Sequence, residues 1–319
     1  MTTSVRLMLS AALLALAVPV SAAAPPSGND AGMSLEEFQK SLHPQSGRIV
    51  LTGAKASLDL GGRYYFLGQA DSRRVLVDAW GNHPDSATGV LGMIFPAGAD
   101  FSNSWGAVVT YEDTGHISDI DAANEDYASV LKDMQAATEK ANEERAGAGY
   151  GKLHLAGWAQ APTYDPERKV LVWARDLVAD GEKEHSLNYD VRSLGRAGVL
   201  SLNMVDGMSR LAVVRTAAGD LGSTVRFDPG ARYADFVPGT DPEAEYGLAG
   251  LVAAGAGMAA AKKLGLLGLL AAFGKKAFAL IAVAAVPIGR WLKRKAGGGA
   301  QEGEGEFGGE GEGEGAGAA

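Results

Sequence analysis

The alternation of apolar and polar residues between positions 153 and 205 constrains the fold of this chain most. The pattern is clearest in residues 186–194, where two sets of side chains alternate: Leu187, Tyr189 and Val191 on one face, and Asn188, Asp190 and Arg192 on the other. Similar runs, separated by turns rich in glycine and proline, occupy residues 153–159, 169–174 and 199–205. A period of two with such turns is typical of antiparallel strands. We therefore predict a four-stranded antiparallel meander with one face open to water.

One strong helical pattern, residues 121–145, precedes this meander. Its apolar residues recur every three or four positions and form one stripe: Tyr127, Val130, Leu131, Met134, Ala137 and Ala141. Ser118 and Asp121 resemble an N-terminal capping pair, and Gly147 lies where the pattern stops. We expect this helix to cover one face of the sheet.

Further strands are expected upstream, and together the elements predict one exported domain over residues 27–240. The expected strands are residues 48–51, 56–60, 64–67, 74–80, 93–95 and 107–111, after a short helix at 35–42. Residues 221–236 have an extended, turn-rich pattern, and residues 237–242 form a linker. The predicted fold class is α+β, mostly an antiparallel sheet with one long covering helix. A C-terminal transmembrane helical segment is expected to follow it.

The first 24 residues have the pattern of a secretory signal peptide. Arg6 supplies the positive charge, residues 7–18 are apolar apart from Ser10, and small residues at 20–24 offer a cleavage site. The alternative is a transmembrane helix that stays in the mature protein. Cleavage is favoured because the apolar run is shorter than the ~20 residues that a span needs. The chain has no cysteine, so neither a lipoprotein anchor nor a disulfide is expected.

Residues 247–292 predict that the domain is attached to a membrane. Two lysine pairs separate three apolar blocks, and a basic cluster with a tryptophan follows: Lys262, Lys263, Lys275, Lys276, then Arg290, Trp291, Lys293, Arg294 and Lys295. Each block alone is too short to cross ~30 Å of hydrocarbon. We therefore favour one span within residues 264–291, with the basic cluster on the cytoplasmic side. The alternatives are a hairpin of two short helices and a helix lying in the interface.

The last segment, residues 297–319, is rich in glycine and glutamate and is expected to be a disordered tail. Its six glutamates account for much of the net charge of −9, so the domain itself is only mildly acidic. The domain has no basic stripe, which argues against nucleic acid as the partner. The two ends together predict a bacterial inner-membrane protein, with the main domain facing the periplasm and the acidic tail in the cytoplasm.

No motif in the sequence assigns a reaction. There is no G-x-S-x-G elbow, no phosphate-binding G-x-x-x-x-G-K-[ST] and no H-E-x-x-H. Residues 255–260 match the dinucleotide pattern G-x-G-x-x-A, but they follow no predicted strand and favour close helix packing. The five histidines share no short metal-ligand spacing, and Asp119 and Asp121 lack the order of a calcium loop. We therefore predict no catalytic residue, no cofactor and no metal site.

The polar face of the predicted meander is the best candidate for a binding surface. Its residues come from three strands: His154, Trp158, Asn188, Asp190, Arg192, Ser201 and Asn203. Aromatic, amide and charged groups together could bind a sugar, a peptide or the edge of a partner. The alternative is an ordinary solvated face on which Asp190 and Arg192 pair across strands.

Several short segments of the chain form a recognisable set. They are residues 75–81 (VLVDAWG) with Asn82 and Pro84, 92–96 (GMIFP), 111–121, 157–164, 187–192, 198–203 (GVLSLN) and 246–248 (YGL). Together they resemble the DUF2167 family of bacterial membrane-anchored proteins, over roughly residues 35–292. The resemblance implies an exported domain with a C-terminal anchor. It carries over no catalytic residue, and His116 stands where an aromatic residue is expected.

Three hypotheses follow for the function. The first is a non-enzymatic envelope protein whose domain binds a protein partner or a cell-wall component beside the inner membrane. The second is a hydrolase or transferase on envelope substrates, which would use carboxylates with an amide such as Asn188 or Asn203. A large pocket with two carboxylates of raised pKa would favour it. The third is a membrane segment that itself oligomerises or perturbs the bilayer.

Overall fold

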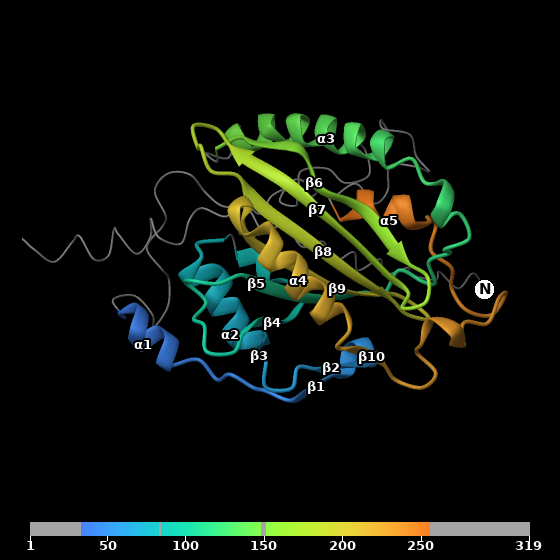
Figure 1. Cartoon of the computed structure of the whole chain (residues 1–319), viewed down its shortest axis with the longest axis horizontal. Helices are drawn as coiled ribbons and strands as arrows, with labels where there is room; N and C mark the ends of the chain where they lie inside the picture. Colours follow the sequence, from blue (N-terminus) through green and yellow to red (C-terminus); the bar gives the residue numbers. More distant parts are fainter. Residues whose placement is uncertain (1–32, 83, 148–150, 256–319) are drawn as a thin grey trace, which may run out of the picture.

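The main element of the structure is a seven-stranded antiparallel sheet. The computed structural model describes residues 33–82, 84–147 and 151–255. In spatial order the strands are β3 (Tyr64–Gly68), β4 (Val90–Pro96), β5 (Gly106–Glu112), β9 (Val199–Gly207), β8 (Ser186–Leu194), β7 (Val170–Ala179) and β6 (Leu153–Asp165) (Figure 1). Every neighbouring pair is antiparallel. The two edge strands of the sheet are therefore β3 and β6.

One face of this sheet is covered by a helix and a second, smaller sheet. The helix is α4 (Leu211–Gly222), and the small sheet has the order β1 (Arg48–Leu51), β2 (Ala56–Asp59) and β10 (Val225–Phe227). One buried cluster joins Leu58 of β2, Val214 of α4 and Val191 of β8. Such a contiguous cluster is the core of this half of the domain.

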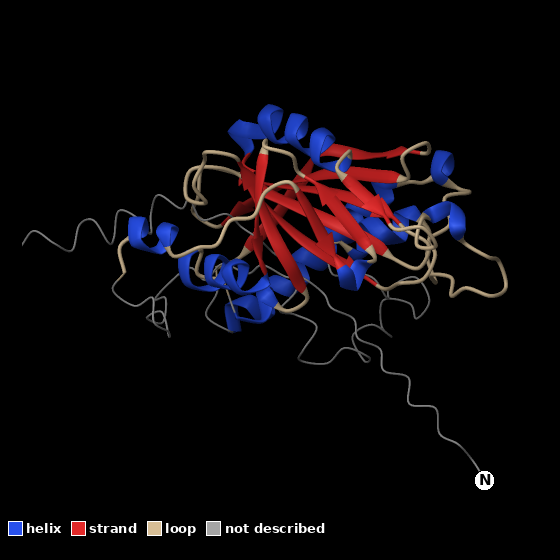
Figure 2. Cartoon of the chain, turned by 90° about the horizontal axis from the view of Figure 1, so that it is seen from below, coloured by secondary structure: helices blue, strands red, loops and turns tan. Residues whose placement is uncertain are grey.

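The opposite face carries helices over both ends of the sheet. These helices are α1 (Leu35–Lys40), α2 (Gln69–Arg74), α3 (Tyr127–Gly147) and α5 (Leu248–Ala254). α3 and α5 share a buried cluster with Trp173 of β7, whereas α1 and the residues after α2 share another with Met93 of β4. Figure 2 shows helices on both sides of the strands. The first cluster draws mainly on β6 and β7 and the second on β3, β4 and β5, and on β9 they include opposite ends of the strand, Val199 and Val205. Neither cluster contains the polar residues of β9 between those two positions.

Short helical turns connect the regular elements. They are Thr52–Ala54, Pro84–Ala87, Ala122–Asn124, Met208–Arg210 and Tyr233–Asp235. A π-helical turn, Val75–Ala79, directly continues α2. The predicted strand at residues 74–80 is therefore wrong. Its buried residue Ala79 follows Val75 by four positions and Leu76 by three, which is a helical spacing rather than a period of two.

The structure confirms the predicted α+β class, with a mostly antiparallel sheet and a long helix packed against it. The meander predicted between residues 153 and 205 is β6 to β9. The long helix starts at Tyr127 and not at residue 121, because Asp126 caps it. The Asp126 carboxylate accepts hydrogen bonds from the N–H groups of Ala128 and Ser129, at 3.2 and 3.0 Å.

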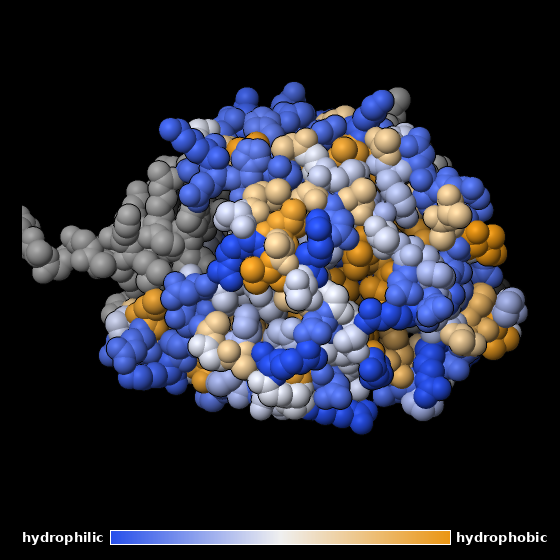
Figure 3. Space-filling view, viewed as in Figure 1, coloured by the Kyte–Doolittle hydropathy of each residue, from blue (hydrophilic) through white to orange (hydrophobic). Residues whose placement is uncertain are grey.

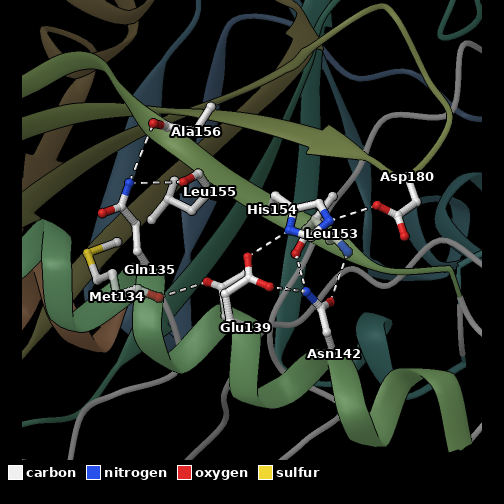
Figure 4. Close-up of polar contacts among 10 residues, drawn as sticks. Met134, Gln135, Glu139, Asn142, Leu153, His154, Leu155, Ala156 and Asp180 are labelled. Carbon is white, nitrogen blue, oxygen red and sulfur yellow. Dashed lines mark hydrogen bonds and ion pairs between the residues drawn. The ribbon is translucent and has the colours of Figure 1, made fainter.

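Helix α3 also covers the open edge of β6. The Asn142 side chain accepts a hydrogen bond from the Leu153 N–H at 2.9 Å and donates one to the Leu153 carbonyl at 2.8 Å (Figure 4). Gln135, two turns earlier, donates to the Leu155 carbonyl at 3.1 Å. The backbone groups of an edge strand otherwise face solvent or pair with another chain. The two amides therefore take the place of a neighbouring strand at these residues.

Helix α5 lies at the start of the segment that was predicted to enter the membrane, yet it packs inside the domain. Its residues Leu248, Leu251 and Val252 are buried in the cluster with Trp173. Among residues 33–82, 84–147 and 151–255, no helix combines the length and apolarity that a membrane span requires. Residues 256–292, including every lysine and arginine of the predicted membrane segment, lie outside the described residues. The predicted signal peptide and tail lie outside them as well.

Replacing Asn142 by alanine should lower the free energy of unfolding by ~1–3 kcal/mol, because it leaves two backbone groups of Leu153 without partners. Urea denaturation followed by circular dichroism measures the change. Glu143→Ala removes an exposed side chain from the next position of the helix. That control should stay within ~0.5 kcal/mol of the wild type. Equal losses in both variants would mean that the amide does not support β6.

Candidate functional site

A row of polar side chains crosses the middle of the sheet, on the face that carries α3 and α5. We call this row the charge strip, and it consists of Glu112, Arg175, Asp190, Arg192, Ser201 and Asn203. The strand register sets it, because Arg192 of β8 is paired with Ser201 of β9, and Asp190 with Asn203. Successive side chains of a strand point to opposite faces. The strip therefore follows from the same alternation that sends Leu187, Tyr189 and Val191 to the other face.

Two arginines and two carboxylates hold the strip together. Arg192 donates from Nη1 to Glu112 and to Ser201, and from Nη2 to Asp190 at 3.1 Å. The other Asp190 oxygen accepts from Arg175 Nη2 at 3.3 Å. Asn203 donates a further hydrogen bond to Asp190 at 3.0 Å. The formal charges balance, so the strip has no excess charge to offer a ligand.

The strip is buried, so the prediction of a water-exposed polar face is wrong. Asp190 has no exposed surface, and Asn188, Arg192 and Ser201 are also buried. Asn203 is half-buried. Alternation within a strand shows which face a polar side chain occupies, but not its surroundings. Water and an oppositely charged partner inside the protein can both satisfy such a side chain. The predicted pairing of Asp190 with Arg192 does occur, but along one strand and inside the domain.

The end of α5 lies close over the strip. A Cβ atom added to Gly255 would lie 2.8 Å from the Trp173 ring and 3.2 Å from Nη2 of Arg192. The first distance is shorter than real Cβ contacts, so a side chain at this position would force a neighbour to move. The guanidinium of Arg192 also stacks over the Trp173 ring, at 5.3 Å from its centroid. Glycine therefore allows the chain to pass directly over the ion pairs.

Burial disfavours the charged form of both arginines, and the carboxylates near each one decide whether its pKa is lowered or raised. Burial lowers the pKa of Arg175, which has one close carboxylate, and the neighbouring charge of Arg192 adds to this effect. Burial also disfavours the charged form of Arg192, but Glu112 and Asp190 together outweigh it and raise the pKa of Arg192. Arg192 is therefore the more firmly held cation of the strip.

The other two residues of the predicted binding face lie at the edge of the sheet. His154 lies between Glu139 of α3 and Asp180 after β7, with nitrogen to oxygen distances of 2.7 and 2.8 Å (Figure 4). Trp158 donates from Nε1 to the Tyr127 carbonyl at 3.3 Å. Both side chains thus bind α3 to β6. The structure separates them from the charge strip, which contains Asp190, Arg192, Ser201 and Asn203.

A second polar cluster, which the sequence analysis missed, surrounds Asp119. One Asp119 oxygen accepts from Tyr164 at 2.6 Å and from Lys169 at 2.7 Å, and the other accepts from Tyr233 at 3.0 Å. Burial alone would raise the pKa of Asp119, but these three partners lower it. Burial and the nearby Asp119 raise the pKa of both tyrosines, so the phenols stay protonated as donors. The Asp119 oxygens are therefore occupied by protein donors.

His116 lies beside this cluster, and its ring packs as an aromatic side chain would. Its imidazole stacks on Phe236 with ring centroids 3.7 Å apart, and Tyr233 lies 4.3 Å away. Burial lowers the pKa of His116, which favours the neutral ring. This stack attaches the segment before α5 to the rest of the domain. In the part of the chain that the structure describes, no three side chains of the ligating types are grouped closely enough to hold a metal ion.

Asp190→Asn should lower the free energy of unfolding by ~3–5 kcal/mol, because it removes the carboxylate that two buried guanidinium groups share. Urea denaturation measures the loss. Asp133→Asn, at an exposed position of α3, is the matched control. It should unfold like the wild type. A small loss for Asp190→Asn would show that the ion pairs are not what holds these strands.

The environment of His154 predicts a pH-dependent contribution to stability. Hydrogen bonds to Glu139 and Asp180 raise the pKa of His154 above its ordinary 6.5. The contribution is then fully present below that ordinary value and is lost as the pH rises through the raised one. Unfolding midpoints of the wild type and His154→Gln, compared from about pH 5 to about pH 9, should converge as the pH rises. A gap that does not change with pH would contradict this.

Comparisons with known proteins agree with the segment pattern. The model of the DUF2167 family, described as a protein of unknown function, matches residues 43–286. No curated protein matches the chain. Among solved structures, cyanobacterial PsbP (CyanoP) from Synechocystis sp. PCC 6803 is 11% identical, covering 64% of this chain and 99% of its own, with a TM-score of 0.33. That TM-score is too low to inform the fold or the activity. Since the family match spans most of the sequence, the protein belongs to the DUF2167 family.

Proposed function

We propose that this chain is a membrane-anchored envelope protein whose domain faces the periplasm and binds a protein partner or a cell-wall component. The position of α5 carries the proposal. This helix packs in the core and ends at Ala254, directly before the apolar residues 256–292 with their lysine pairs. The folded domain therefore reaches the start of the segment that the sequence predicts to be in the membrane.

The charges of the sequence set the proposed orientation. The first 24 residues would direct export, and the basic cluster at residues 290–295 would stay on the cytoplasmic side. The acidic tail, residues 297–319, follows that cluster and would share its side of the membrane. The domain between these ends would then face the periplasm.

Binding is favoured over the alternative of a carboxylate-dependent hydrolase or transferase. That alternative calls for two carboxylates of raised pKa in one pocket. Burial raises the pKa of Asp206, but its carboxylate lies 3.0 Å from Nε of Arg210, an arrangement suited to an ion pair. In the charge strip, the carboxylates of Asp190 and Glu112 already accept hydrogen bonds from the buried arginines. The outer surface is then the place where the domain would act.

Fractionation of cells tests the anchor. The full chain should sediment with the inner membrane and resist alkaline extraction, whereas a chain without residues 256–319 should appear in the soluble periplasmic fraction. Removing only residues 297–319 is the matched control and should leave the protein in the membrane. A truncated chain that still sediments with membranes, or a full chain that stays in the cytosol with its first 24 residues, would contradict the proposal.

The same cells can report on the partner. Among the described residues, the large exposed apolar side chains come from separate segments: Val50, Ile120, Val213 and Val237. Polar residues are interspersed with apolar ones on the face in Figure 3. Ile120 is the most exposed, at 87%. A photoreactive residue at position 120 should crosslink to one discrete species, and the same residue at the exposed Arg73 should not. Identical crosslinking patterns at both positions would contradict a specific partner at this loop.

A further inference from the structure

A pocket of about 330 Å³ lies on the face of the sheet that carries α4 and the small sheet. It is formed where β7 begins and β8 ends, against the corner between α4 and β10. Its polar lining residues are Arg168, Ser193, Ser223 and Arg226, and its apolar ones include Val170 and Phe227. None of the described residues that line it is an aspartate or a glutamate. Two guanidinium groups without a carboxylate favour an anionic ligand.

Ser193 provides an independent indication of a ligand. The residue is only 4% exposed, and its Oγ has no hydrogen-bond partner within the described structure. Buried hydroxyl groups nearly always have a partner. This one lines the pocket, so its hydroxyl can donate a hydrogen bond to a ligand oxygen.

The two arginines keep donors available. Arg226 donates from Nη1 to the Ser223 and Val225 carbonyls, at 2.6 and 2.8 Å, which fixes the guanidinium beside the pocket. Its other two nitrogens make no hydrogen bond to the described residues. Arg168 is exposed in the turn between β6 and β7, where its backbone N–H donates to Asp165 at 3.0 Å. Its side chain forms no ion pair with the described part of the chain.

Hydrogen bonds at the end of α4 reduce the repulsion that a helix C-terminus would exert on an anion. A helix C-terminus carries partial negative charge on its last carbonyl groups, which would repel one. The Asp220 carbonyl accepts from the Ser223 hydroxyl at 2.6 Å, and the Leu221 carbonyl accepts from Thr224 at 2.7 Å. Arg226 engages the Ser223 carbonyl that follows. The carbonyl groups of Asp220, Leu221 and Ser223 thus already accept hydrogen bonds, which reduces this repulsion.

We propose that this pocket binds a phosphate group, carried either by a soluble phosphate ester or by a phospholipid headgroup. Arg168, Ser193 and Arg226 approach from three different elements, which suits the several oxygens of a tetrahedral anion. Val170 and Phe227 would contact the organic part of the ligand. The proposal goes beyond the anchored binding role and does not depend on membrane attachment.

Isothermal titration calorimetry on the full chain in a non-ionic detergent tests the proposal. Inorganic phosphate, glycerol 3-phosphate and glycerophosphoglycerol serve as the probes. Arg168→Gln and Arg226→Gln should each weaken binding by about tenfold or more. Arg73→Gln, at an exposed arginine of α2, is the matched control and should bind like the wild type. No heat with any probe, or equal affinity in all three variants, would overturn the proposal.

Ser193→Ala separates binding from folding. It should weaken binding several-fold while leaving the unfolding midpoint unchanged or raised, because it removes an unpartnered buried hydroxyl. Unchanged affinity in this variant would remove Ser193 from the site and overturn the three-donor arrangement. Preference for glycerophosphoglycerol, the deacylated headgroup of phosphatidylglycerol, would support a lipid source. Preference for glycerol 3-phosphate would support a soluble ester.

Discussion

The ion pairs that Asp190 makes with two buried arginines are the interaction on which the rest of the domain depends. The apolar clusters on this face of the sheet lie over its two ends, and the strip fills the space between them. A buried guanidinium is tolerated only with a partner, so the register of β5, β7, β8 and β9 has to bring the four charges together. The shared carboxylate links these strands in a way that their apolar residues alone would not.

The charge strip and the Asp119 cluster are built largely from the segments that carry the family resemblance. Residues 111–121 contribute Glu112 and Asp119, residues 187–192 contribute Asp190 and Arg192, and residues 198–203 contribute Ser201 and Asn203. These positions therefore have a structural explanation that needs no reaction. The binding role that we propose would then fall to surfaces outside these two clusters.

The sequence predicted the positions of the strands better than the burial and the contacts of their side chains. The pattern of residues 186–194 coincides with β8, because the side-chain period is a local property of the strand. Burial of the charge strip could not be predicted in this way, because it brings Glu112 to Arg192, 80 residues away, and places the end of α5, beyond residue 247, over Arg192. The Asp119 cluster was missed for the same reason, since Tyr233 lies 114 residues away in a segment without a clear pattern. Contacts between distant segments leave no periodic signal.

Backbone groups at both edges of the sheet already have hydrogen-bond partners, which limits how another protein can recognise this domain. At one edge, Asn142 and Gln135 occupy backbone groups of Leu153 and Leu155. At the other, Gln45 exchanges two backbone hydrogen bonds with Phe66 of β3, at 2.8 and 2.7 Å. An incoming extended peptide would find these positions taken, so β-augmentation there would first have to displace them. Recognition through side chains on loops and helices requires no such displacement.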